Sequence, residues 1–210
     1  MSEAIHRTAG PDGSGADASL ADGGDDAAVI ARSLRSPECF GAIFDRHAPA
    51  IYRYIARRLG PDSADDLLAE TFLVAFRRRG RYDGAHPDAR PWLYGIATRL
   101  VSRHRRDETR FFRAIARTGI DPVSEAVEGQ IVDRVAAQAA RKELAAALAR
   151  LSQAQRDVLL LVANGLSYTE AGLALGLPAG TVSSRLARAR RVVREALAGS
   201  DPTRPEEAQA

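Results

Sequence analysis

The sequence predicts an all-α protein made of two small helical domains joined by a flexible linker. Apolar residues recur at helical spacing in two blocks, 26–107 and 135–199, and no segment alternates apolar and polar residues as a half-buried strand does. The intervening segment, 108–134, has weak periodicity and several glycines and acids, so it is interpreted as the linker. Residues 1–25 have almost no large apolar side chains and, like 200–210, are expected to be disordered.

Helical signals in the N-terminal block begin near Ala27. Ser36 followed by Pro37 marks a helix start, and Pro49 is expected to open the next helix, which ends at Gly60. The apolar sides of these two helices are formed by Phe40, Ile43, Phe44, Ile51, Tyr52, Tyr54 and Ile55. The polar side of the second helix carries Arg53, Arg57 and Arg58.

The third helix, Ser63 to Arg79, divides into an inward apolar side and an outward acidic side. The inward side holds Leu68, Thr71, Phe72 and Ala75, and the outward side holds Asp66, Ala69, Glu70, Leu73 and Arg77. Such an acidic face is either plain solvated surface or a docking site. Because the body of the chain is basic, a basic partner protein is the favoured interpretation.

A loop from Gly80 leads into a long helix predicted from about Ala89 to Arg106. Its buried positions are Leu93, Ile96, Ala97, Leu100 and Val101, and its open side carries Thr98, Arg99, Ser102, Arg105 and Arg106. Arginines beside an aromatic ring can hold single-stranded nucleic acid, and Trp92 lies at the edge of this side. The alternative is that Trp92 and Tyr94 only fill the core, which is favoured for Tyr94.

The C-terminal block ends in a predicted helix-turn-helix. Helices are expected over Val135 to Leu151 and after Ser152, which Gln155 caps. Ser167 and Glu170 form a second capping box, ahead of a short helix whose apolar positions are Ala171, Leu173, Ala174 and Leu175. Gly176 stops that helix, Pro178 and Gly180 carry the turn, and the next helix begins near Thr181 with the buried stripe Val182, Leu186, Ala189, Val193 and Leu197.

The outer side of this last helix is basic, because a turn of about 100° per residue places Ser184, Arg185, Arg188 and Arg191 opposite the apolar stripe. The simplest alternative is an amphipathic hairpin with a solvated arginine face. The capped short helix, which carries no arginine, favours a DNA-reading helix that enters the major groove.

Composition and charge agree with a nucleic-acid partner. No apolar run approaches the about 20 residues of a membrane span, and the first residues do not resemble a signal peptide, so a soluble, cytoplasmic protein is expected. A single cysteine, Cys39, excludes an internal disulfide and is assigned no chemistry. The net charge is +3, but acids gather at the two ends and leave a basic body that suits a polyanion. All basic residues except Lys142 are arginine, which favours phosphate contacts or reflects genomic base composition.

Together the two blocks resemble a bacterial RNA polymerase sigma factor of the extracytoplasmic-function (ECF) class. The segments 65–72 (DDLLAETF) and 91–97 (PWLYGIA) look like the polymerase-binding and promoter-melting parts of sigma domain 2. The segments 151–158 (LSQAQRDV) and 180–190 (GTVSSRLARAR) look like sigma domain 4. The resemblance therefore assigns domain 2 to 26–107 and domain 4 to 135–199.

The resemblance implies a division of labour between these domains. Domain 2 would dock on the largest-subunit clamp of core RNA polymerase through Asp65, Asp66, Glu70 and Leu73. It would capture the melted −10 strand through Arg79, Arg81, Trp92, Arg99, Ser102 and Arg106. Domain 4 would bind the polymerase flap and read the −35 promoter duplex through Thr181, Ser183, Ser184, Arg185, Arg188 and Arg191. The linker would lie in the RNA channel, and whether an anti-sigma factor binds the chain stays open.

Four positions depart from the family pattern. Ala69 stands where a clamp-facing glutamine is common, so docking would depend more on the neighbouring acids. Arg99 replaces a frequent asparagine, and Ser183 and Ala187 are smaller than is usual, so neither promoter sequence can be copied from relatives.

Two other functions compete with this interpretation. A stand-alone helix-turn-helix regulator would leave the acidic helix and the Trp92 segment without a role, and co-purification with core polymerase separates the two hypotheses. An enzyme acting on nucleic acid is disfavoured, because the four histidines have no metal-ligand spacing and there is no catalytic carboxylate pair or phosphate-binding loop. The sequence therefore predicts no catalytic residue, metal or cofactor.

Overall fold

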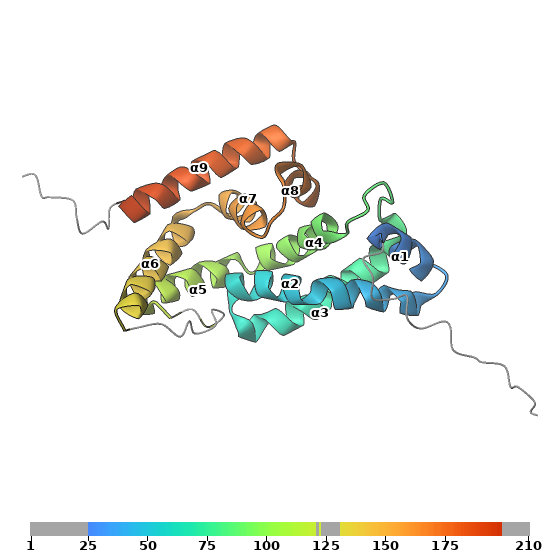
Figure 1. Cartoon of the computed structure of the whole chain (residues 1–210), viewed down its shortest axis with the longest axis horizontal. Helices are drawn as coiled ribbons and strands as arrows, with labels where there is room; N and C mark the ends of the chain where they lie inside the picture. The colour runs from blue at the N-terminus through green and yellow to red at the C-terminus, as the bar shows by residue number, and fades with distance from the viewer. Residues whose placement is uncertain (1–24, 121, 123–130, 199–210) are drawn as a thin grey trace, which may run out of the picture.

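The computed structural model describes residues 25–120, 122 and 131–198, with side chains from 137 in the last range. All regular structure in these ranges is helical, which confirms the predicted class. Figure 1 shows three tiers: α2 and α3 form one side, α4 and α5 follow each other through the middle, and α7 to α9 cover the other side, with α6 closing one end. The predicted disordered ends, and most of the predicted linker beyond Gly119, lie outside the described residues.

The first tier contains α1 (Asp26–Ser33), α2 (Gly41–Leu59) and α3 (Ala64–Arg78), with short 3-10 turns between them. The prediction that Pro49 opens a new helix is wrong, because α2 runs through it without a break. Proline lacks a donor and usually ends a helix. Here α2 packs against α3, α4 and α5, and these contacts support the helix on both sides of Pro49.

The middle tier contains α4 (Arg90–Arg103) and α5 (Arg105–Thr118). The predicted helix to Arg106 is divided at His104, whose backbone leaves the helical region. The start of the predicted linker is also wrong, because α5 buries Glu108, Phe112 and Ile115 on one face. This short stripe includes a carboxylate, so the sequence pattern missed it.

The other side contains α6 (Ile131–Arg150), α7 (Gln153–Ala163), α8 (Tyr168–Leu175) and α9 (Ala179–Ala198). Both predicted capping boxes are confirmed, at the starts of α7 and α8. Gly176 ends α8 at φ 67°, a left-handed conformation that favours glycine. The stripe of α9 is buried at Val182, Leu186 and Ala189, but Val193 is only half-buried and Leu197 is exposed, so the predicted end of the stripe is wrong. In α8, Leu173 is exposed rather than packed.

One hydrophobic core joins the two predicted domains. It contains Ile55 and Leu93 from the first two tiers and Leu161, Ala174 and Leu186 from the third. A second cluster of Phe112, Leu148, Leu151 and Ala189 joins α5 to α6 and α9. No helix in the described ranges has the length and apolar character that crossing a membrane requires.

The backbones of the two domains approach closely where α4 meets α8. A side chain at Gly95 would place its Cβ 2.5 Å from the backbone oxygen of Ala174. Only glycine therefore permits this contact between the backbones.

Candidate nucleic-acid and polymerase interfaces

The acidic face of α3 lies on the surface. Asp65 and Asp66 are exposed, and Leu73 is 47% exposed although it is a large apolar side chain. Glu70 is half-buried and lies 3.5 Å from the guanidinium of Arg103. The opposite side of α3, with Thr71, Phe72 and Ala75, is buried as expected. The outward side therefore forms one acidic patch, in which three acids accompany an exposed leucine: Asp65, Asp66, Glu70 and Leu73.

The loop after α3 has one arginine directed into the protein and one exposed. Arg79 donates to the backbone oxygens of Phe76 (2.7 Å) and Ser33 (3.3 Å), and its guanidinium carbon lies 3.8 Å from the ring centroid of Phe76. These contacts tie α1 to the end of α3. Arg81 is exposed, so it is more accessible to a ligand than Arg79.

The open side of α4 is narrower than the sequence predicts. Arg99 is exposed and Ser102 is half-buried, but Thr98 is buried and its hydroxyl lies 2.7 Å from that of Tyr54, so its predicted exposure is wrong. Tyr94 is a core residue, as favoured. It packs edge-on against Tyr54, with ring centroids 5.1 Å apart.

Trp92 is half-buried at the start of α4, where its ring contacts Tyr82 at a centroid distance of 5.0 Å. The hydroxyl of Tyr82 donates to the backbone oxygen of His86 across the loop. One edge of the Trp92 ring is therefore covered by the loop, and this contact couples the loop conformation to the tryptophan.

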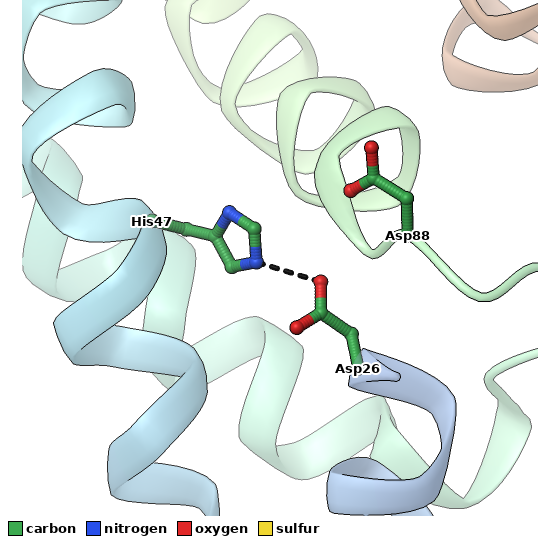
Figure 2. Close-up of side chains that lie close together, drawn as sticks. All are labelled: Asp26, His47 and Asp88. Carbon is green, nitrogen blue, oxygen red and sulfur yellow. Dashed lines mark hydrogen bonds and ion pairs between the residues drawn. The ribbon is translucent and has the colours of Figure 1, made fainter. Parts of the chain in front are cut away.

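Asp26 braces the other end of this loop. Its backbone N–H donates to the oxygen of Pro87, and its Oδ2 accepts from the N–H of Ala89, both at 2.9 Å. The carboxylate also accepts from Arg46 at 2.9 Å and lies 2.7 Å from Nε2 of His47, the contact drawn in Figure 2. Burial opposes ionisation, but the bonds to His47, Ala89 and Arg46 outweigh it and lower the Asp26 pKa to about 2.

The group Asp26, His47 and Asp88 has the donor types of a metal site, with ligand atoms within 4.8 Å of one another. Figure 2 shows Asp88 across from the other two, at the start of α4. The oxygens already have partners, since Asp88 accepts from the N–H of Arg90 and Asp26 accepts from a guanidinium. A cation would have to displace this positive charge, so the group is interpreted as a structural brace.

The helix-turn-helix presents most of its predicted DNA contacts. Ser183, Ser184, Arg188 and Arg191 are exposed, and Thr181 is half-buried. Arg185 is half-buried and lines a cavity of about 320 Å³ with Asp157, Leu175 and Leu177. The Glu170 carboxylate accepts from the backbone N–H of Ser167 at 2.7 Å, which lowers the pKa of Glu170 and stabilises the start of α8.

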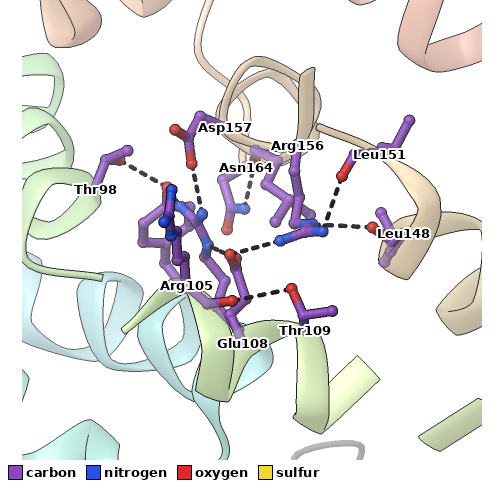
Figure 3. Close-up of polar contacts among 12 residues, drawn as sticks. Thr98, Arg105, Glu108, Thr109, Leu148, Leu151, Arg156, Asp157 and Asn164 are labelled. Carbon is purple, nitrogen blue, oxygen red and sulfur yellow. Dashed lines mark hydrogen bonds and ion pairs between the residues drawn. The ribbon is translucent and has the colours of Figure 1, made fainter. Parts of the chain in front are cut away.

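A buried ionic network, which the sequence analysis missed, lies between the two domains. Arg58 of α2 contacts Glu108 of α5 and Asp157 of α7, each at 2.5 Å, and Arg156 contacts the other oxygen of Glu108 at 2.7 Å. Figure 3 shows Arg156 also pointing to the backbone oxygens of Leu148 and Leu151. The placement of Arg58 on a solvated polar side is therefore wrong, because its side chain is fully buried.

Burial and charge act in opposite directions within this network. Burial opposes the charged form of Arg58, but Tyr54, Glu108 and Asp157 more than offset it, and the Arg58 pKa lies above its ordinary value. Burial raises the pKa of Asp157, and Arg58 offsets only part of that rise. Two arginines and two carboxylates thus balance in a site that excludes water.

The fold and these surfaces define a DNA-binding protein of two helical regions, one carrying an acidic patch beside a basic loop and one carrying a helix-turn-helix. Residues 43–111 match the family model described as Sigma-70 region 2, and residues 141–192 match the one described as Sigma-70, region 4. The chain belongs to the ECF RNA polymerase sigma factors, which direct promoter-specific transcription initiation.

Relatives support this assignment along most of the chain. ECF RNA polymerase sigma factor SigC of Mycobacterium tuberculosis (strain CDC 1551 / Oshkosh) is 35% identical over 185 residues, 85% of this chain and 94% of SigC. ECF RNA polymerase sigma factor BldN of Streptomyces coelicolor is 33% identical over 158 residues, 74% of this chain but only 59% of BldN. The chain thus spans less than two thirds of BldN.

A solved structure shows the same fold. The sigma factor RpoE in complex with the anti-sigma factor NepR, from Bartonella quintana, aligns with a TM-score of 0.53 and 24% identity, covering 77% of this chain and 98% of RpoE.

Proposed function

We propose that residues 26–107 hold core RNA polymerase and the melted −10 strand while residues 135–199 read the −35 duplex. The observation that carries this proposal is that the region 2 and region 4 matches coincide with the two surfaces the sequence predicts: an acidic patch around an exposed leucine, and a capped helix-turn-helix with exposed arginines. The chain acts in the cytoplasm and transfers no group itself, so it is a specificity factor rather than an enzyme.

The acidic patch on α3 is proposed to dock on the largest-subunit clamp. Charged residues steer the encounter, and burial of Leu73 supplies apolar contact at the centre of the patch. Asp65, Asp66 and Glu70 surround it. Because Ala69 adds no side-chain hydrogen bond, these acids carry the polar part of the contact.

The −10 strand is proposed to lie along the loop 79–89, the open side of α4 and the start of α5, which carries Arg106. Arg81, Arg99 and Arg106 are exposed there and would contact phosphates, Ser102 would contact the strand, and Trp92 would stack on a base. For Arg79, strand contact requires release from Ser33 and Phe76, so we propose that Arg79 positions the loop in the free protein.

The −35 duplex is proposed to meet the first turns of α9. Thr181, Ser183, Ser184 and Arg185 face base edges, whereas Arg191 lies further along α9 and reaches phosphate. Arg188 lies between them and is within reach of either a base edge or a phosphate. The polymerase flap is the proposed protein partner of the same region. The NepR complex of RpoE supports adding an anti-sigma factor to the proposed partners.

Run-off transcription with core polymerase and a genomic fragment library tests the proposed function. The native chain should direct initiation at a restricted set of promoters. The double variant Asp66→Arg/Leu73→Ala should bind core polymerase at least about tenfold more weakly, the size of loss expected when an interface centre is removed. The matched control, Asp45→Arg/Leu34→Ala, changes an exposed acid and an exposed leucine that belong to none of the proposed contacts and should bind normally.

Equal core affinity of both double variants, each with a native circular dichroism spectrum, would place the polymerase contact elsewhere. Binding to DNA without any association with core polymerase would instead favour the stand-alone regulator.

A further inference from the structure

A wide groove runs between α5, the end of α6 and the start of α7, and Arg106 is the one residue of its lining with a proposed promoter contact. Its volume is about 1130 Å³. None of the lining residues is acidic. Most of the lining consists of arginines: Arg105, Arg106, Arg110, Arg113, Arg117, Arg150 and Arg156. The groove is therefore strongly positive, and the charge comes from three different helices.

Most of these guanidinium groups have no anionic partner among the residues that the structure describes. Arg156 is held by Glu108, and Arg110 lies 3.3 Å from Asp107. In the part of the chain that the structure describes, the other five arginines of the groove form no ion pair: Arg105, Arg106, Arg113, Arg117 and Arg150.

The arginines of α5 are also close to one another. Arg106 and Arg110 are four residues apart, as are Arg113 and Arg117, and like charges at this helical spacing repel. The line from Arg106 to Arg117 spans eleven residues, about 16 Å at the rise of an α-helix. A bound polyanion would remove this repulsion along the whole line.

A second observation points to an acceptor ligand. The amide nitrogen of Gln153, which lines the groove at the start of α7, is buried and has no hydrogen-bond partner. A buried donor without an acceptor is costly, and native proteins seldom leave one without a reason. Gln153 lines both this groove and the smaller cavity beside Arg185, so rotation of its side chain toward the groove would add an amide donor to the guanidinium groups.

We propose that this groove binds the phosphate backbone of a single-stranded nucleic acid. Arginine matches phosphate with two parallel hydrogen bonds, and the floor beneath the arginines is formed by small side chains, Ala116, Ala146 and Ala149, which leave room for an extended chain. A protein ligand would need a pocket for an aromatic or aliphatic anchor, and the lining offers only Leu151 beyond these alanines.

The site goes beyond the proposed promoter contacts, with which it shares only Arg106. It requires α5, which follows the region 2 helices, to lie against α6 and α7, which begin region 4. A strand bound there contacts both regions at once. It therefore stabilises the packed arrangement of the two regions relative to any state in which they separate.

The test measures fluorescence anisotropy of a labelled thymidine oligomer of about twelve nucleotides with the full chain, over about 50–200 mM salt. The groove variant Arg113→Gln/Arg117→Gln changes two exposed arginines outside the proposed promoter contacts. The matched control, Arg53→Gln/Arg57→Gln, removes the same charge from exposed arginines at the same spacing on α2.

The groove variant should bind about tenfold more weakly, and its salt slope should fall by about 1.4, because each phosphate contact on a single strand contributes about 0.7. The control should bind within about twofold of the native chain. A uridine oligomer should bind as tightly as the thymidine oligomer, since the lining addresses phosphate and not the sugar. Circular dichroism of both variants checks that they fold.

Equal weakening by the groove and control variants would overturn the proposal, because binding would then follow overall charge. So would a polyglutamate peptide of matched charge that competes as well as the oligomer, since the groove would then take an acidic protein segment.

Discussion

Glu108 is the residue whose change should cost the most stability for the smallest change in structure. Its side chain is fully buried and accepts from two buried arginines, Arg58 at 2.5 Å and Arg156 at 2.7 Å. Glu108→Gln keeps the shape and one oxygen but removes the negative charge. With Asp157 the only remaining carboxylate, the network would carry one uncompensated positive charge.

The expected cost follows from this geometry. Breaking a buried ion pair by neutralising one partner typically costs about 3–5 kcal/mol, because the other charge stays buried without compensation. Part of the cost is offset, since Arg156 also donates to the backbone oxygens of Leu148 and Leu151. We therefore expect a loss near the lower end of the range, about 3 kcal/mol.

Urea unfolding followed by circular dichroism measures this loss. At a slope of about 2 kcal/mol per molar, the midpoint should fall by about 1.5 M. Glu195→Gln, at an exposed carboxylate 3.7 Å from Arg191, should change stability by less than about 0.5 kcal/mol. If the two variants lost the same small amount, the network would not hold α2, α5 and α7 together as argued.

Three further predictions concern other parts of the molecule. Gly95→Ala should lower the free energy of unfolding by about 1–3 kcal/mol in thermal melts because the new Cβ meets the α8 backbone, whereas Gly41→Ala, with open space around its Cβ, should be neutral or stabilising; the same sign at both sites would refute the contact. The Asp26 pKa is lowered from 3.8 to about 2, so the carboxylate's contribution to the free energy of unfolding is fully present above about pH 4 and is lost as pH falls through 2. Asp26→Asn should therefore lower the free energy of unfolding by about 2 kcal/mol or less at pH 6, after solvent screening, and by almost nothing near pH 2. A loss that does not change with pH would contradict this. On a −35 duplex library, Arg185→Ala should cost about 1–3 kcal/mol and flatten preference at one base pair, whereas Arg191→Ala should weaken all sequences alike and lower the salt slope by about one unit; the reverse pattern would mean that α9 enters the groove differently.

The sequence alone determined the features that depend on local spacing. The capping boxes at Ser152 and Ser167, the left-handed stop at Gly176 and the first half of the α9 stripe were predictable, because each depends on residues within one or two helical turns. The acidic face of α3 followed from the same periodicity. The motifs that resemble sigma domains 2 and 4 could also be found in the sequence, because each lies within a short contiguous segment.

The tertiary structure decided the features that depend on residues far apart in the chain. Pro49 stays inside α2 and α5 forms within the predicted linker, because neighbouring helices pack against both and outweigh local preference. The positions of Arg58 and Glu108 were not predictable, since their partners lie about fifty residues or more away. From the sequence alone, an arginine on a helix is predicted to be solvent-exposed, because the pattern does not show whether a carboxylate from another helix will pair with it. That pairing, which makes burial of charge tolerable, exists only once the two regions have packed.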